Sequence, residues 1–223
     1  IDVRNLKKTI VKKFEAVIFL AASQNDPSDS INSWKFYEIS KKYTIKIAKI
    51  CKQNNIKFIF PSSCSVYGYG KKVFNEKSIT NPLTNYSKNK LKIEKALAKL
   101  SGKDFSPIAL RFSTVFGYSS RIRLDLVINM LCMHAITKKK IILNSNGLAW
   151  RPHISIDDVC LAFYLCLISN INNGKLNIFN IGHNKNNLQI IKIAKIIKNL
   201  TKAKIYFKLD EKKDFIYDRN IKN

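Results

Sequence analysis

Short apolar runs alternate along this chain with longer segments whose apolar residues recur at helical spacing. The runs lie at residues 14–22, 57–60 and 105–112. They are typical of strands buried on both faces of a parallel sheet. Helical periodicity extends over residues 34–54 and 91–100, with a turn-rich loop at 25–30. This alternation predicts an α/β fold built on a doubly wound parallel sheet.

The second half of the chain continues the alternation with shorter elements. Strands are predicted at 139–144, 176–181 and 204–209, and helices at 159–168 and 187–200. Asp157 and Asp158 stand just before one of these helices, where carboxylates suit the positive end of the helix dipole. We therefore interpret this acidic pair as a helix start and not as an acid/base pair.

A hydroxyl, a phenol and an amine are spaced along residues 58–90 as a proton-transfer site requires. Ser63 follows the apolar strand, and Tyr86 and Lys90 share one face of the helix that residues 81–90 open. A neighbouring ammonium favours the phenolate, so a phenol of pKa about 10 can exchange protons near neutral pH. Ser63 can hold the substrate hydroxyl whose proton Tyr86 removes while the carbon gives up a hydride. We predict these three residues as catalytic.

The Tyr-x-x-x-Lys spacing is weak by itself because this chain is rich in lysine. Tyr37 with Lys41 and Tyr67 with Lys71 have the same spacing. Neither pair has a serine-bearing strand upstream and a helix start around it. We interpret both as chance pairs of solvated side chains.

Several motifs in a fixed order resemble the extended short-chain dehydrogenase/reductases, specifically the NAD-dependent nucleotide-sugar epimerase/dehydratase family. The motifs are residues 62–68 and 85–90, then 2–4, 17–22, 110–117, 147–152, 157–158 and 179–182. The resemblance implies a Rossmann-like sheet lacking its first strands, because no glycine precedes Gly68 to form a dinucleotide-binding turn. We expect an N-terminally truncated chain that binds dinucleotide poorly. Residues 1–117 would form the partial dinucleotide-binding domain and 118–223 a small substrate-binding lobe, with some segments returning to the sheet.

The same resemblance implies a cofactor, NAD, and a substrate, a nucleotide-diphosphate sugar. Residues expected at the cofactor are Asp2, Val3, Leu20, Ala21, Ala22, Tyr86, Lys90, Phe112 and Val115. Residues expected at the substrate are Ser65, Thr114, Arg123 and Arg151, the last of these by bidentate contact with the diphosphate. Thr114 is equally compatible with a structural turn, and Arg123 with an ion pair or a surface role.

Two neutral residues argue against one activity of the family. Cys64 and Ser65 occupy the positions where the resemblance places the Asp and Glu of 4,6-dehydratases. Elimination of water across the sugar then has no general acid or base. The prediction is therefore an epimerase that removes and returns a hydride at one sugar carbon. A nucleotide-sugar reductase and a non-catalytic truncated remnant remain alternatives.

Composition bears on partners and compartment. The net charge is +25, but of the 40 basic residues six are Arg and 34 are Lys, spread over every segment. We interpret the lysines as solvated surface and expect no nucleic acid as a partner, although a polyanion-binding protein stays open. No apolar run approaches the roughly 18 residues of a membrane span, so no membrane is expected. Five cysteines without metal-ligand spacing indicate a reducing cytoplasm and no metal site. A homodimer is also expected.

Overall fold

The computed structural model describes residues 2–22, 33–70, 73–208 and 220–221. It divides into two compact units, between which the chain passes several times. Unit 1 comprises Ile1–Gly68, Ile79–Phe112 and Leu161–Asn180, and unit 2 comprises Tyr69–Ser78, Ser113–Cys160 and Ile181–Asn223. The boundary after residue 117 stays a prediction, as does the role of each part. The loop predicted at 25–30 lies outside the described residues.

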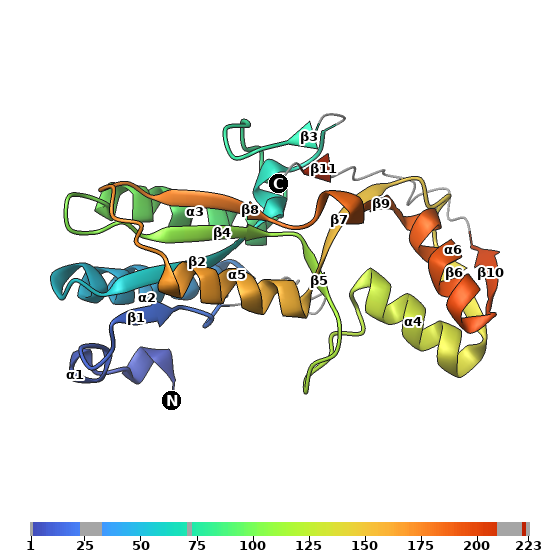
Figure 1. The fold of residues 1–223 in the computed structure, drawn as a ribbon, viewed down its shortest axis with the longest axis horizontal. Coiled ribbons are helices and arrows are strands. Elements are labelled where there is room, and N and C mark those ends of the chain that lie inside the picture. Colours follow the sequence, from blue (N-terminus) through green and yellow to red (C-terminus); the bar gives the residue numbers. More distant parts are fainter. Residues whose placement is uncertain (1, 23–32, 71–72, 209–219, 222–223) are drawn as a thin grey trace. The chain divides into compact units, whose positions relative to one another are not determined.

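Unit 1 is built on a sheet of four strands in the order β1-β2-β4-β8. The strands are β1 (Ala16–Ile18), β2 (Lys57–Ser63), β4 (Ile108–Phe112) and β8 (Asn177–Ile181), whose last residue belongs to unit 2. β1 pairs with β2, and β2 with β4, in parallel (Figure 1). The predicted α/β fold with a parallel sheet is therefore confirmed.

Successive side chains of the central strands point to opposite faces of this sheet, and both faces are buried. Phe58, Phe60 and Ala109 pack in one core cluster with α2 (Ser33–Gln53) and α3 (Asn85–Leu100). On the opposite face Phe112 meets Phe163 of α5 (Ile156–Ile168), with ring centroids 5.2 Å apart. The short elements η1 (Val3–Asn5) and α1 (Lys8–Val11) precede β1, and η2 (Cys64–Tyr67) follows β2.

Two details of unit 1 depart from, or add to, the predicted elements. β1 covers only part of the run 14–22 and lies at the edge of this sheet, and the flanking residues Phe14 and Leu20 are 58% and 64% exposed. α3 begins at Asn85 because Thr84 caps it. The Thr84 hydroxyl accepts from Ser87 N at 3.1 Å, and the Ser87 hydroxyl accepts from Thr84 N at 3.0 Å.

Unit 2 has its own strands and core. One sheet has the order β5-β7-β9, from β5 (Thr114–Phe116), β7 (Trp150–Ser155) and β9 (Asn187–Gln189). Two further pairs are β6 (Lys140–Leu143) with β10 (Lys204–Phe207), and β3 (Val73–Phe74) with β11 (Asn220–Ile221). The helices α4 (Val127–Lys138) and α6 (Ile190–Thr201) pack against β6 through Leu131, Ile141 and Ile193, and η3 (Asn184–Asn186) precedes β9.

Gly68 is required where η2 ends. Its φ is +73°, and a Cβ there would lie 1.9 Å from the backbone oxygen of Asn81. Gly68→Ala should therefore lower the free energy of unfolding by about 2 kcal/mol or more. Gly102→Ala is the matched control, since no atom lies within 4 Å of its added Cβ, and should change it by under about 0.5 kcal/mol. Urea unfolding measures both variants, and equal losses would contradict the steric argument.

Candidate active site

Ser63 is the last residue of β2, at the carboxyl end of a strand in a parallel sheet. Open α/β sheets bind their ligands at this end. The Ser63 hydroxyl accepts a hydrogen bond from the backbone N–H of Ser65 at 3.2 Å and so begins η2. Its side chain is half-buried, which leaves the hydroxyl free to donate its proton to a ligand.

Lys90 ties the first half of α3 to the end of β2. Its side chain is 5% exposed, and Nζ donates to the carbonyl oxygen of Pro61 at 2.7 Å. The same ammonium lies 4.7 Å from the ring centroid of Phe60 and 5.5 Å from that of Tyr86. Because Pro61 stands two residues before Ser63, this bond holds the lysine beside the end of β2 in unit 1.

Burial changes the chemistry of this amine. Desolvation lowers the pKa of Lys90 from 10.5 to about 8, and the carboxylate of Glu94, one helical turn further on, opposes the shift. Lys90 is thus an ammonium at neutral pH and loses its charge as the pH rises through about 8. The half-buried Tyr86 ring meets Tyr37 of α2 edge-on, with centroids 6.4 Å apart.

Two hydroxyls of unit 1 are buried without a hydrogen-bond partner among the described residues. They are Ser65 Oγ, two residues after Ser63, and Ser40 Oγ on α2. An unsatisfied buried hydroxyl costs free energy, so each is a group that a ligand could satisfy. Ser65 keeps its predicted substrate role as a prediction.

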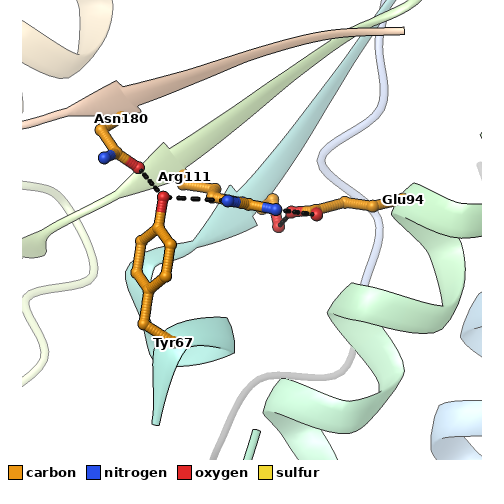
Figure 2. Close-up of polar contacts among 5 residues, drawn as sticks. Tyr67, Glu94, Arg111 and Asn180 are labelled. Atoms are coloured by element: carbon orange, nitrogen blue, oxygen red, sulfur yellow. Dashed lines mark hydrogen bonds and ion pairs between the residues drawn. The ribbon is translucent and has the colours of Figure 1, made fainter. Parts of the chain in front are cut away.

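A buried polar network joins the elements around this site (Figure 2). Arg111 of β4 donates from Nε and Nη2 to the Glu94 carboxylate at 3.1 and 2.6 Å, and from Nη1 to the Tyr67 hydroxyl at 2.9 Å. Tyr67 donates in turn to Asn180 Oδ1 at 2.6 Å, and Ser62 donates to Glu94 at 2.5 Å. All five side chains are nearly inaccessible to solvent.

The sequence interpretation missed this network and was wrong on two tyrosines. Tyr67 is 1% and Tyr37 is 4% exposed, so neither is a solvated side chain. Tyr67 is held by groups 44 and 113 residues away in the chain, which no local spacing could predict. The available signal was Arg111, one of few arginines and set in an apolar strand.

In unit 2 the pairing of β5 with β7 brings two predicted substrate residues near each other. Thr114 pairs with His153, which stands two residues after Arg151 on the same strand face. Arg151 Nη1 donates to the Trp150 carbonyl at 2.9 Å. Arg123 instead forms an ion pair with Asp125, including a 3.0 Å bond from Nε to Oδ1. Asp125 therefore competes with a substrate anion for the Arg123 guanidinium.

The residues predicted at the cofactor fit NAD only in part. Ala21 and Ala22 follow β1 with half-buried small side chains, and Leu20 is exposed, which suits a flat ring or ribose. Phe112 ends β4 in unit 1, whereas Val115 belongs to β5 in unit 2. Tyr86 and Lys90 have the positions given above.

The described N-terminal residues offer no obvious pyrophosphate site. Asp2 accepts three hydrogen bonds from Arg4, two from the Arg4 side chain and one from the Arg4 backbone N–H. These bonds lower the pKa of the Asp2 carboxyl to about 2. Val3 lies in η1. Of the described glycines with positive φ, none joins a strand directly to an α-helix. The described residues therefore supply no glycine cradle of this kind for the phosphates of NAD.

The sequence belongs to a known family. Residues 1–182 match the NAD dependent epimerase/dehydratase family, so the chain is a member of this NAD-dependent branch of the extended short-chain dehydrogenase/reductases.

Curated and solved relatives agree with this membership. The chain is 26% identical over 210 residues to the UDP-glucose 4-epimerase of Lactobacillus helveticus, covering 85% of this chain and 63% of that protein. It is 29% identical over 189 residues to the dTDP-D-glucose 4,6-dehydratase of Dictyostelium discoideum, covering 77% and 42%. The chain thus spans less than two thirds of either relative. The UDP-glucuronic acid 4-epimerase from Bacillus cereus, solved with UDP-glucuronic acid and NAD, has the same fold, with a TM-score of 0.83, 22% identity and coverage of 99% and 70%.

Two features of the described residues bear on other functions. No helix among them has the length and hydropathy that crossing a bilayer requires. Nor do the described ranges contain a group of three or more His, Cys, Asp or Glu side chains that could hold a metal ion.

The buried ion pair of the network should carry far more stability than an exposed one. Arg111→Met leaves the Glu94 carboxylate buried without its counter-ion and should lower the free energy of unfolding by about 3–5 kcal/mol. Arg4→Met is the control, because its 2.5 Å pair with Asp2 has side chains 62% and 38% exposed, and it should leave the free energy of unfolding nearly unchanged. Denaturant unfolding at neutral pH compares them. Similar losses in the two variants would contradict the assigned role of burial.

Proposed function

We propose that this chain carries the catalytic half of an NAD-dependent nucleotide-sugar epimerase. The observation that supports this most is the Lys90 ammonium, which lies against the Tyr86 ring and is bonded to Pro61, two residues before Ser63. A buried ammonium beside a half-buried phenol, at the carboxyl end of a parallel sheet, is suited to moving a proton from a bound hydroxyl.

Each residue would have one task in the reaction. Lys90 stabilises the phenolate form of Tyr86, this phenolate takes the proton of a sugar hydroxyl and becomes the neutral phenol, and Ser63 donates a hydrogen bond to the reacting oxygen. NAD, when bound, would supply the acceptor, and afterwards the donor, of the hydride on the carbon that bears this hydroxyl. If the hydride returns to the opposite face of the ketone, Tyr86 gives back the proton and the product is the epimer.

Side chains around Ser63 favour epimerisation over loss of water. Cys64 and Ser65 are 4% and 5% exposed, and neither provides a carboxyl group. Glu94, the buried carboxylate of α3, is engaged by Arg111 and Ser62 and is not available as a general acid or base. A reductase, which would use only the second half of this chemistry, the delivery of a hydride and a proton to a ketone, is the alternative for the same residues.

The substrate would be a nucleotide-diphosphate sugar. Thr114 and Arg151, on neighbouring strands of unit 2, can supply a hydroxyl and a guanidinium to a diphosphate. Arg123 could join them once it leaves Asp125. The cytoplasmic location and the homodimer remain predictions.

Removing one phenolic oxygen tests the proposed base. With NAD and a relative's glycine-rich strand–turn–helix segment supplied in trans, Tyr86→Phe should lower conversion of UDP-sugars by about 100-fold or more, because the variant lacks the oxygen proposed to accept the substrate proton. Its unfolding midpoint should not change. Tyr164→Phe is the control, since that ring is 57% exposed on α5, and it should keep full turnover. NMR of the sugar anomeric protons follows conversion, and full activity in Tyr86→Phe would refute the assignment.

The alternative interpretation, a non-catalytic remnant, predicts a different result for cofactor binding than the proposed enzyme does. β1 is an edge strand, so another parallel strand can pair with its free side. We expect no saturable NAD binding by the chain alone, and saturable binding once a relative's glycine-rich strand–turn–helix segment is supplied in trans. Calorimetric titration measures both mixtures. If the supplied segment restores no binding, the remnant interpretation is the better one.

A further inference from the structure

A hollow outside the site described above opens on the surface of unit 1. Its volume is about 730 Å³, within the range of small-molecule sites. It is bordered by Lys8 of α1, by residues of α2 from Lys41 to Gln53 and by one residue of α3, Ala96. No residue of the proposed catalytic set lines it, so the hollow is independent of the proposed function.

Among the residues that the structure describes, five lysines and no acidic residue line this hollow. They are Lys8 of α1 and Lys41, Lys42, Lys46 and Lys49 of α2. Helical spacing places the α2 lysines on one side of the helix, within reach of one another and of Lys8. Five positive charges facing one concave space repel one another, and the repulsion is relieved when an anion enters.

The hollow's described contacts leave most of this charge uncompensated. Lys41 forms an ion pair with Glu38, which lies outside the lining. Lys8 donates to the neutral side chain of Gln53 at 3.0 Å, and Lys46 lies 5.6 Å from the ring centroid of Tyr43. Within the described parts of the chain, Glu38 is therefore the one acidic residue that forms a salt bridge with a lysine of the lining. Glu38 is shared with Lys92, which lies outside the lining.

We propose that this hollow, here called the lysine hollow, binds a phosphoanhydride chain, as in tripolyphosphate or a nucleoside triphosphate. Lysines act as compact point charges with three donors each, which suits several phosphates in a row better than one planar carboxylate. Ile45, Ile50 and Ala96 add an apolar part of the lining, against which lysine stems or a nucleoside can lie.

Because lysine is abundant throughout the chain, the lysines of the hollow must be compared with a similar group of lysines elsewhere on the surface. Lys192, Lys195 and Lys198 are exposed on α6 of unit 2 and have nearly the same spacing as Lys42, Lys46 and Lys49. Removing either triple lowers the net charge by the same amount. Only the α2 triple lines the lysine hollow.

The experiment is calorimetric titration of the intact chain with tripolyphosphate at about 150 mM salt, where long-range attraction between exposed charges is screened. We expect one saturable site. The triple variant Lys42→Gln, Lys46→Gln, Lys49→Gln should weaken binding by at least about tenfold, while the α6 triple changes it less than about twofold. Unfolding midpoints verify that both variants remain folded.

Further titrations identify the ligand. Adenosine triphosphate should bind like tripolyphosphate or more tightly, whereas inorganic phosphate should bind weakly and adenosine should not bind. Absence of saturable tripolyphosphate binding, or equal weakening by the two triples, would overturn the proposal and leave incidental surface charge. Binding of adenosine as tight as that of adenosine triphosphate would overturn it as well.

Discussion

The buried ion pair between Arg111 and Glu94 constrains the rest of unit 1. Two charges removed from water cost several kcal/mol each, and only complete hydrogen bonding offsets that cost. Here the carboxylate accepts from Ser62 and twice from Arg111, and the third guanidinium nitrogen, Nη1, donates to the Tyr67 hydroxyl. These partners come from β2, η2, α3 and β4. A shift of any of these elements would leave a buried charge unsatisfied.

This constraint also determines where the candidate catalytic groups lie. Glu94 and Lys90 are one turn apart on α3, and they contact Ser62 and Pro61, the two residues before Ser63. The helix therefore meets the end of β2 through two successive polar contacts. A charged Lys90 is destabilising at this position, because desolvation disfavours the ammonium form. A purely structural contact could use an apolar side chain, so a buried ammonium here agrees with the proposed role in proton transfer.

Much of unit 1 could be predicted from the chain because its signals are local. Continuous apolar runs indicated β2 and β4, and helical periodicity indicated α2 and α3. Leu20 and Phe14 were wrongly assigned to a buried strand, since an apolar run does not reveal that its strand lies at a sheet edge. Tyr67 was taken for a solvated residue, because its partners Arg111 and Asn180 are remote in sequence.

Residue order alone was enough for the family, the α/β class and the spacing of Tyr86 with Lys90, because motifs and helix faces depend on near neighbours. The contacts that those residues make depend on the tertiary structure. The contact of Lys90 with Pro61, the pairing of Thr114 with His153 and the gathering of Lys8 with the α2 lysines each join segments that only packing brings together. Burial and electrostatics are properties of that packing, and they cannot be read from spacing along the chain.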